Sequence, residues 1–427
     1  MAVIKPFKAI RYNTSLIGDP GAVITPPYDV ISIEEQDRLH QKNPYNIIRL
    51  EFGKTYPADN DNNNRYTRAS DILKEWLNEQ VLKADNEPHY YLYEQSYTYD
   101  SNTYKRRGIV AALALESYQS KVVLPHELTM TEPKKDRLQL LSSSRTNISP
   151  IFTLFPDPEK RMADFFGQIE SEKPLFEAIE DSGQAHRLWA ISDSALQSDF
   201  TTYMANQPLL IADGHHRYET ALKYYQELQD TKDIIPPGAA NILTVMVSIN
   251  DPGLLMLPTH RLLHGLDIEK INALHQVIND QFTTIDFGDP RQLDRQNYWQ
   301  ELVQQCRTKN GFGFITKESA RLLIPNNFAD VDALPVSLLH DQILKPVLSA
   351  EAGTEAIKNT LGFSHDFSSS LDSVLSGNSD AAFILDTIPI DAVFDRASRG
   401  IIMPQKSTYF YPKLPSGIVL HHMELSY

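Results

Sequence analysis

Hydrophobic and polar residues alternate along the chain with the spacings of both helices and strands. Between residues 66 and 82, apolar side chains recur every three or four positions, which predicts an amphipathic helix with Trp76 on its buried face. The alternating stretch "HYYLYEQSYTYD", the turn "DSNT" and the apolar "GIVAALALESY" together predict a β-hairpin over residues 89–118. This part of the chain therefore combines helix with antiparallel sheet.

The middle of the chain continues to combine strands with helices. We predict strands in "SPIFTLF", "PLLIA", "NILTVMVSIND" and "GLLMLPTHRLL", with a helix after "PLLIA". A chain of 427 residues exceeds one ordinary core, so two domains are expected. We place them at 1–265, with the candidate site motifs, and at 266–427, a second α/β domain that contributes a C-terminal loop to the site. The predicted fold class is α/β, of a mixed α+β kind.

The net charge of the chain indicates which classes of binding partner are disfavoured. The chain has 40 Lys and Arg against 55 Asp and Glu, a formal net charge of -15, and no block of basic residues. A general nucleic-acid binder is therefore disfavoured, because its non-specific affinity comes from clustered cations. A local cationic pocket for a small anion remains compatible with an acidic surface.

The cysteine content and the length of the apolar runs indicate the cellular compartment in which the protein is expected. Cys306 is the single cysteine, so an intrachain disulfide and a cysteine-built zinc site are excluded, and a reducing compartment is expected. "MAVIKPFKAIRY" lacks a signal-peptide core, and the longest apolar run, "GIVAALALE", is shorter than a membrane span of about 20 residues. We expect a cytoplasmic protein without membrane contact, for which a homodimer is one compatible assembly.

The motif "IADGHHRYETAL" carries the most specific chemistry. It joins a predicted strand to a predicted helix through Gly214, so backbone N–H groups and the positive end of the helix dipole can face an anion. Arg217 can add a bidentate fork and His216 a further donor, a combination that suits a polyphosphate. Asp213 would repel that ligand unless a cation intervenes. Mg2+, with Asp213 and Asp251 as candidate ligands, would resolve the conflict.

Two other interpretations of this motif stay open. Asp213 could cap the helix while both histidines form local hydrogen bonds. Alternatively, zinc could bind to His215, His216 and Asp213 together with His126 or His260. Adjacent histidines usually point apart, however, and the H-E-x-x-H spacing is missing. The zinc alternative implies a metal-dependent hydrolase.

In five ordered motifs the chain resembles the uncharacterised prokaryotic family known as domain of unknown function 1015 (DUF1015). The motifs are "PPYDVIS", "LPHELT" with "DRLQLL", "ADGHHRYETAL", "DPGLLMLPTHR" and "MPQKSTYFYPK". The central motif also resembles the phosphate-binding box of ParB N-terminal domains, sulfiredoxins and free-serine kinases. The resemblance implies a ParB/sulfiredoxin-like nucleotide-binding core with an additional mixed-sheet domain.

The phosphate-binding box of this chain matches the box of each of these relatives only in part. Sulfiredoxins carry G-C-H-R, with the histidine and arginine on ATP phosphates; His216 and Arg217 occupy those places, whereas His215 replaces the catalytic cysteine. The D-G-H-x-R box of free-serine kinases is matched by Asp213, Gly214, His215 and Arg217. ParB-type DNA partitioning is disfavoured, because strands rather than a helix-turn-helix are predicted after the helix. The resemblance therefore implies a small-molecule kinase.

A phosphotransferase also needs a carboxylate that orients or deprotonates the acceptor hydroxyl. Asp29 in "PPYD", Glu127 in "PHELT" and Asp251 in "NDPG" are available, although each could equally serve a turn or a cap. We predict Glu127 or Asp29 as the base and His215 as a further catalytic residue. The predicted nucleotide-binding residues are Asp213, Gly214, His215, His216, Arg217 and Lys406, and the predicted substrate-binding residues are Arg11, Tyr28, His126, Thr129, Thr259, His260 and Arg261.

The predicted function is a nucleotide-dependent phosphotransferase acting on a small hydroxylated metabolite, with free L-serine as the first candidate. The expected cofactors are ATP or ADP with Mg2+. The expected partners are the nucleotide and the small-molecule substrate, without nucleic acid or membrane. Two alternatives stay open: a non-catalytic regulator that binds ATP or CTP, and the metal-dependent hydrolase. Nucleotide consumption that depends on an added amino acid would distinguish the kinase from the regulator.

Overall fold

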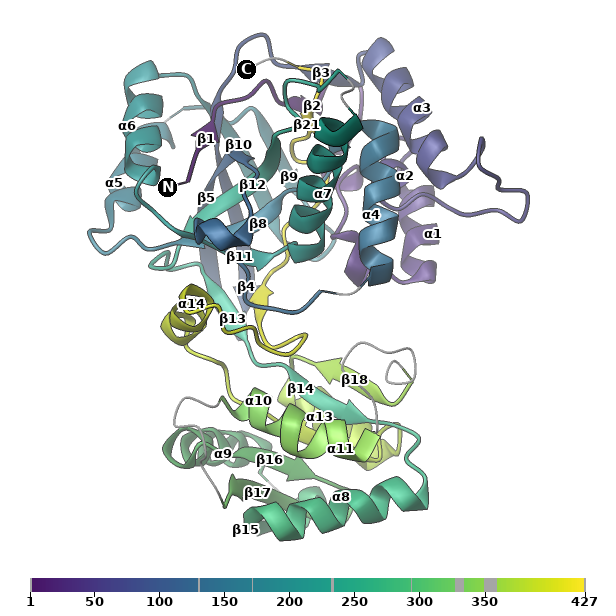
Figure 1. Ribbon diagram of the computed structural model, residues 1–427, viewed down its shortest axis with the longest axis vertical. Helices are drawn as coiled ribbons and strands as arrows, with labels where there is room; N and C mark the ends of the chain where they lie inside the picture. Colours follow the sequence, from purple (N-terminus) through teal and green to yellow (C-terminus); the bar gives the residue numbers. More distant parts are fainter. Residues whose placement is uncertain are drawn as a thin grey trace. The chain divides into compact units, whose positions relative to one another are not determined.

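The chain folds into two compact units (Figure 1). The computed structural model describes residues 2–129, 131–170, 172–231, 234–292, 294–326, 334–348 and 359–425. Unit 1 comprises Met1–Pro125, Thr129–Leu255 and Pro412–Tyr427, and unit 2 comprises His126–Leu128 and Met256–Tyr411. The predicted boundary near residue 265 lies slightly after the observed one. The C-terminal segment differs more from the prediction, because Pro412–Tyr427 belongs to unit 1 and not to the second unit.

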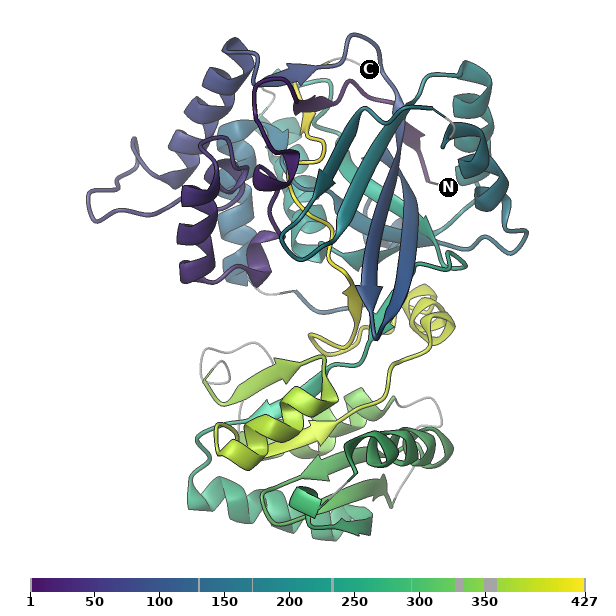
Figure 2. The same cartoon turned by 180° about the vertical axis from the view of Figure 1, so that it is seen from behind.

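The C-terminal segment belongs to unit 1 because it forms backbone hydrogen bonds there. β21 (His421–His422) pairs antiparallel with β7 (Thr146–Asn147). Leu420 and Ile10 exchange backbone hydrogen bonds of 2.9 and 3.0 Å. Figure 2 shows this yellow segment running among the elements of unit 1. Hydrophobic patterning along the chain carries no signal for such a return.

A mixed nine-stranded sheet forms the centre of the described part of unit 1. Its strands run in the order β6-β11-β8-β12-β5-β4-β10-β9, and β1 pairs with β5. β11 is parallel to β6 and antiparallel to β8, β12 is parallel to β8, and the remaining pairs are antiparallel. The predicted hairpin is confirmed as β4 and β5, and the mixed α/β fold class is confirmed. The bounds are β1 (Ile4–Lys5), β4 (Tyr90–Tyr99), β5 (Asn102–Ala114), β6 (Val123–Leu124), β8 (Ile151–Phe155), β9 (Phe176–Ile179), β10 (Ala185–Ile191), β11 (Leu209–Asp213) and β12 (Asn241–Ser248).

Helices pack on this sheet and on one another. α7 packs against α4, and α4 packs against α3 (Figure 1). α3 confirms the helix predicted over residues 66–82: a capping box at Asn64 starts it, and it ends at Asn78, just before Gln80 takes a φ of 61°. The bounds in this unit are η1 (Pro20–Ala22), η2 (Tyr28–Val30), α1 (Ile33–Lys42), α2 (Ile48–Glu51), α3 (Arg65–Asn78), η3 (Tyr118–Ser120), α4 (Thr131–Ser144), α5 (Arg161–Ile169), α6 (Ser194–Met204) and α7 (His215–Thr231), and a small sheet pairs β2 (Ile10–Tyr12) with β3 (Leu82–Ala84).

Unit 2 is built on a six-stranded sheet in the order β15-β17-β16-β19-β14-β18, counted over its described residues. Each pair in that order is antiparallel. Leu302 and Cys306 of α9 and Leu371 of α13 pack in its core. The bounds are β13 (Leu255–Leu257), β14 (His260–Leu263), α8 (Ile268–Gln281), β15 (Phe282–Gly288), η4 (Pro290–Gln292), α9 (Arg295–Lys309), β16 (Phe312–Ile315), β17 (Ala320–Pro325), α10 (Pro335–Leu338), η5 (Leu339–Leu344), α11 (Lys345–Leu348), β18 (Leu361–Ser364), α13 (Phe367–Ser376), β19 (Ala381–Ile384), α14 (Ile390–Ser398) and β20 (Tyr409–Tyr411). In the described ranges no helix has the length and hydropathy needed to cross a membrane.

Candidate functional site

A strand, one glycine and a helix form the centre of the candidate site, as the sequence predicts. β11 ends at Asp213, Gly214 takes a φ of 95°, and α7 begins at His215. A Cβ added at Gly214 would lie 2.9 Å from Ile151 Cγ2 and 3.1 Å from the Arg217 guanidinium. Both the positive φ and the crowding therefore require glycine. The turn directs the positive end of the α7 dipole toward the loop side of the junction.

Gly214→Ala is expected to lower the free energy of unfolding by about 3 kcal/mol, because strain at positive φ adds to the steric clash. Urea denaturation followed by circular dichroism measures the change. Gly183→Ala is the matched control: Gly183 has a φ of 82° with no heavy atom within 4 Å of an added Cβ. Its expected loss is only about 1 kcal/mol. Equal losses for the two variants would contradict the role assigned to crowding at the junction.

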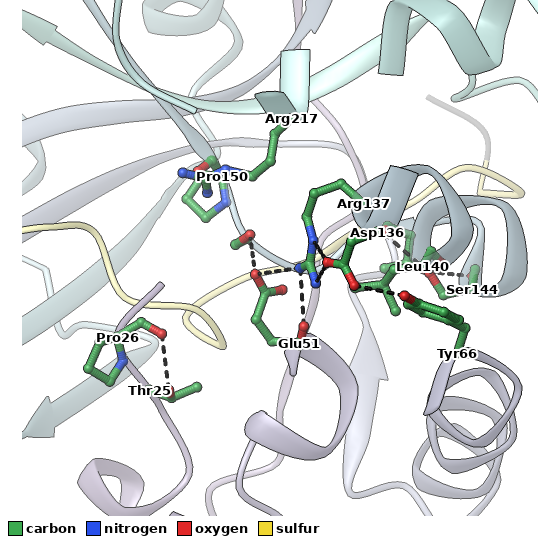
Figure 3. Close-up of polar contacts among 12 residues, drawn as sticks. Thr25, Pro26, Glu51, Tyr66, Asp136, Arg137, Leu140, Ser144, Pro150 and Arg217 are labelled. Atoms are coloured by element: carbon green, nitrogen blue, oxygen red, sulfur yellow. Dashed lines mark hydrogen bonds and ion pairs between the residues drawn. The ribbon is translucent and has the colours of Figure 1, made fainter. Parts of the chain in front are cut away.

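Two cations hold the carboxylate of Asp213. Arg217 Nη2 lies 2.6 Å from Asp213 Oδ2, and Lys413 Nζ contacts Asp213 Oδ1. Arg217 Nη1 also donates to the carbonyl oxygen of Pro150, toward which its side chain points in Figure 3. The side chains of Asp213, Arg217 and Lys413 are only 17, 12 and 14 % exposed. One carboxylate against two cations leaves this group with a net positive charge.

The predicted magnesium ligands, Asp213 and Asp251, both have partners within the protein. Both oxygens of Asp213 are engaged by cations in this structure. Asp251 instead accepts hydrogen bonds from the backbone N–H groups of Gly253 at 2.8 Å and Arg107 at 3.4 Å. Burial raises the pKa of Asp251 to about 6. Within the described residues, His, Cys, Asp and Glu form no group of three or more that could hold a metal ion.

Lys413 is the nearby cation that the sequence interpretation missed. The side chains of Gln95 and Arg106, which are cross-strand partners in β4 and β5, hold the backbone around it. Arg106 Nη2 donates to the carbonyl oxygen of Pro412 at 2.6 Å, and Gln95 Nε2 donates to that of Lys413 at 3.2 Å. The sequence predicts Lys406 of "MPQKSTYFYPK" as a nucleotide-binding residue. Lys406 lies in unit 2, whereas Lys413, the last residue of the same motif, contacts Asp213.

Arg106 and Gln95 form a clamp on the backbone of Pro412 and Lys413, and Arg106 also contacts β8, the strand that pairs with Asp213. Arg106 is 1 % exposed and also donates to Gln95 Oε1 at 2.5 Å. Its guanidinium carbon lies 4.7 Å from the centre of the Phe152 ring, and Phe152 is the cross-strand partner of Asp213. Burial lowers the pKa of Arg106. The clamp of Gln95 and Arg106 thus fixes where Lys413 meets Asp213.

The "PPYD" loop meets a second arginine cluster in the same unit. The Arg137 guanidinium lies 3.9 Å from the centre of the Tyr28 ring. Its Nη1 lies 3.3 Å from Glu51 Oε1 (Figure 3). The same Glu51 oxygen also accepts a hydrogen bond of 3.0 Å from Ser149 Oγ. Arg137 Nε and Nη2 donate to Asp136 Oδ2 at 2.7 and 2.5 Å. Arg137 belongs to the motif "DRLQLL" and is not among the residues predicted from the sequence to form the site.

Residues of three sequence motifs therefore lie close together in unit 1: Tyr28 of "PPYDVIS" contacts Arg137 of "DRLQLL", and Arg137 lines a cavity with Arg217 of "ADGHHRYETAL". Glu51, Arg137, Ser149 and Arg217 line one small cavity of about 40 Å³. This volume suits a few water molecules at most. Burial raises the pKa of Tyr28 well above its ordinary value, against the lowering effect of the Arg137 and Arg217 charges. The exposed carboxylate of the next residue, Asp29, thus stands beside a neutral phenol.

The two histidines of the motif differ in exposure. His215 is buried, with 8 % of its surface exposed, whereas His216 is half-buried. Because both residues belong to the first turn of α7, the difference follows from the direction in which each side chain leaves the helix. His216 is therefore more accessible to a ligand than His215.

Two other predicted residues of unit 1 have structural partners. Arg11 Nε lies 3.1 and 3.2 Å from the two oxygens of Asp85, so its fork is engaged within the protein. The hydroxyl of Tyr91 also donates to Asp85, at 2.6 Å. Thr129 Oγ1 donates to Glu219 Oε2 of α7 at 2.8 Å. Neither residue contacts Asp213 or Arg217 through these bonds.

The remaining predicted residues form a separate cluster in unit 2. His126 Nε2 lies 2.8 Å from Thr408 Oγ1, and Glu127 forms a parallel β-bridge with Met403. The segment "HEL" thus lies against the residues that precede β20. This places Glu127 in a different unit from the glycine-histidine motif.

Arg261 and His260 are deeply buried in the same unit. Arg261 donates to the carbonyl oxygens of Thr259 at 2.6 Å and Gln405 at 3.2 Å. Burial lowers its pKa to about 10, and the charge of Glu127 opposes that shift. Burial, together with nearby positive charge, lowers the pKa of His260 to about 3, and its Nδ1 accepts a hydrogen bond of 3.2 Å from the backbone of Leu385. His260 is therefore a neutral core residue.

Comparisons with known proteins place the chain in a family. The family model described as "Protein of unknown function (DUF1015)" matches residues 4–341. A search of curated sequences found no match.

Among solved structures, a free serine kinase in complex with AMP shares 13 % identity with a TM-score of 0.38, covering 71 % of this chain and 89 % of that one. A conserved hypothetical protein from Pyrococcus furiosus shares 14 % identity with a TM-score of 0.38, covering 71 and 94 %. SbnI from Staphylococcus aureus shares 9 % with a TM-score of 0.36, covering 72 and 85 %. Likenesses of this size carry no inference about activity.

Proposed function

The chain belongs to the DUF1015 family, and from that premise we propose that it is a nucleotide-dependent phosphotransferase acting on a small hydroxylated metabolite. The observation that carries the proposal is the β11–Gly214–α7 junction, where Asp213 is held between Arg217 and Lys413. A helix start combined with a net positive side-chain group attracts a polyanion such as a nucleotide polyphosphate. The resemblance of the motif to the D-G-H-x-R box supports the same reading.

The nucleotide phosphates compete with Asp213 for its two cations. Arg217 and Lys413 already face the junction, so a bound phosphate exchanges one carboxylate contact for a stronger multivalent anion. His216, half-buried in the first turn of α7, adds a donor. In this proposal Lys413 and Arg217 neutralise the phosphate charge, the role predicted from the sequence for Mg2+ on Asp213. The ParB/sulfiredoxin-like ancestry of the core is part of the same proposal.

Asp29 is our preferred general base. It is exposed on η2 in the same unit as the junction, next to Tyr28, whose ring contacts Arg137 and whose phenol feels the charge of Arg217. Glu127 belongs to unit 2 and forms a bridge with Met403 there. In the step proposed, Asp29 takes the proton of the acceptor hydroxyl, whose oxygen bonds to the terminal phosphorus while the bond from that phosphorus to the bridging oxygen breaks. The shortened nucleotide leaves.

The acceptor proposed first is free L-serine, with ATP or ADP as the donor. Phosphorus NMR on mixtures of the protein with ATP, ADP or CTP and single amino acids tests this directly. A new phosphomonoester resonance that requires both nucleotide and serine supports the kinase. Saturable nucleotide binding without consumption under any of these conditions favours the regulator that binds ATP or CTP. Tightly held zinc in stoichiometric amount would favour the hydrolase.

Asp29→Asn is expected to lower kcat about a thousandfold while leaving the dissociation constant for the nucleotide unchanged, because the amide cannot accept the acceptor's proton. Coupled steady-state kinetics and a nucleotide titration measure the two quantities. Glu34→Gln, which changes another exposed carboxylate shortly after the same loop, is the matched control and is expected to leave both unchanged. Full turnover in Asp29→Asn, or loss of turnover in Glu127→Gln instead, would identify a different base.

A further inference from the structure

Unit 2 contains a cavity of about 600 Å³. Its lining comes from the C-terminal end of α9, the start of α10 and the segment 385–389 after β19, together with Thr259 and Ser407. Figure 1 labels α9 and α10 within unit 2. A cavity of this volume accommodates a small organic molecule rather than a few waters.

The walls of the cavity are mainly apolar. Leu334, Val336, Leu385 and Ile388 contribute aliphatic side chains to the lining. Cys306, at 3 % exposure, adds a thiol whose pKa burial raises to about 12, so this side chain is neutral and behaves as part of the apolar wall. An apolar wall of this kind stabilises a ligand by removing hydrocarbon surface from water. The body of a fitting ligand is therefore apolar.

One ion pair lies among these lining residues. Arg307 Nε and Nη2 bond to the two carboxylate oxygens of Asp386, and Asp386 Oδ1 also accepts from the backbone N–H of Thr387 at 2.7 Å. The Arg307 side chain is 67 % exposed, whereas that of Asp386 is 14 % exposed. A guanidinium and a carboxylate thus stand side by side with no net charge between them. A ligand bearing one carboxylate and one ammonium group complements both without leaving either charge uncompensated.

We propose that this cavity binds a small zwitterionic molecule with an apolar body, the chemical class of aromatic and branched aliphatic amino acids. The ligand carboxylate would bond to Arg307 and its ammonium group to Asp386, while its side chain lies against Leu334, Val336 and Ile388. An amino acid with a charged side chain would place that charge against apolar walls, which is unfavourable. The site is independent of the junction in unit 1, so it stands or falls separately from the proposed phosphotransferase.

The single thiol of the chain reports on occupancy, because Cys306 lines the cavity. The experiment measures the rate at which 4,4′-dithiodipyridine labels Cys306 in the full-length protein, with L-phenylalanine or L-leucine as probes. At ten times the dissociation constant of the probe, labelling is expected to slow about tenfold, because only the ligand-free fraction reacts. L-Glutamate and L-lysine are expected to leave the rate unchanged.

Two matched variants test the role of the ion pair. Arg307→Gln is expected to abolish protection by L-phenylalanine, whereas Arg295→Gln, which removes another α9 arginine paired with an aspartate (Asp372), is expected to preserve it. Circular dichroism confirms that both variants are folded. Protection that survives in Arg307→Gln, or protection by indole but by no amino acid, would overturn the zwitterionic ligand class. Labelling rates that no amino acid changes would overturn the site itself.

Discussion

Arg217→Ala is expected to raise the dissociation constant for ATP about 100-fold while the chain remains folded. Charge-assisted hydrogen bonds to a ligand contribute about 3 kcal/mol, and each decade of affinity corresponds to about 1.4 kcal/mol. The substitution also changes the charge of the junction: Asp213 with Arg217 and Lys413 carries one net positive charge, and Asp213 with Lys413 alone carries none. Isothermal titration of ATP measures the loss.

The control for this variant lies on the same helix. Lys223 and Glu227 of α7 form an exposed ion pair four residues apart, the spacing that also separates Asp213 from Arg217. Lys223→Ala is therefore expected to leave the affinity for ATP unchanged, because exposed pairs contribute little and this one lies away from the junction. If Arg217→Ala and Lys223→Ala bind ATP equally well, Arg217 has no part in nucleotide binding.

Arg106→Met is expected to lower the free energy of unfolding by about 3 kcal/mol, because it leaves buried oxygens of Gln95 and Pro412 without their donor. Methionine retains most of the side-chain volume, so the loss reports on hydrogen bonds more than on a cavity. The affinity for ATP is expected to fall as well, because the backbone that carries Lys413 is no longer fixed. Guanidinium chloride denaturation and ATP titration measure the two effects.

An exposed arginine of the same unit serves as the control for Arg106. Arg161 of α5 pairs with Asp199 at the surface, with side chains 42 and 55 % exposed. Arg161→Met is expected to cost less than about 1 kcal/mol and to leave nucleotide affinity unchanged. A stable Arg106→Met variant with native ATP affinity would show that the clamp does not position Lys413.

The elements of the fold that local pattern determines were predictable. The strand, glycine and helix around Gly214 follow from an apolar run, one residue able to adopt positive φ, and a helical repeat. The hairpin of β4 and β5 follows from alternation on either side of a polar turn. Helix ends were less exact: α3 stops at Asn78 because Gln80 takes a left-handed conformation, a constraint that apolar periodicity does not report.

The residues around the junction were harder to predict, because they come from distant parts of the chain. Lys413 meets a carboxylate 200 positions earlier, and Arg106 bonds to a carbonyl 306 positions later. A single sequence holds no signal for such pairings; only membership in the motif "MPQKSTYFYPK" marked Lys413. Arg137 was similarly contained in a recognised motif, "DRLQLL", without any local feature that assigns it a partner.

A crystal structure of the protein with bound ADP tests most directly whether the β11–Gly214–α7 junction binds nucleotide phosphates. Phosphate oxygens are expected within hydrogen-bonding distance of the α7 start, with Arg217 and Lys413 turned from Asp213 toward the phosphates. Phosphates bound elsewhere, with Asp213 still held by both cations, would show that the junction is not the nucleotide site.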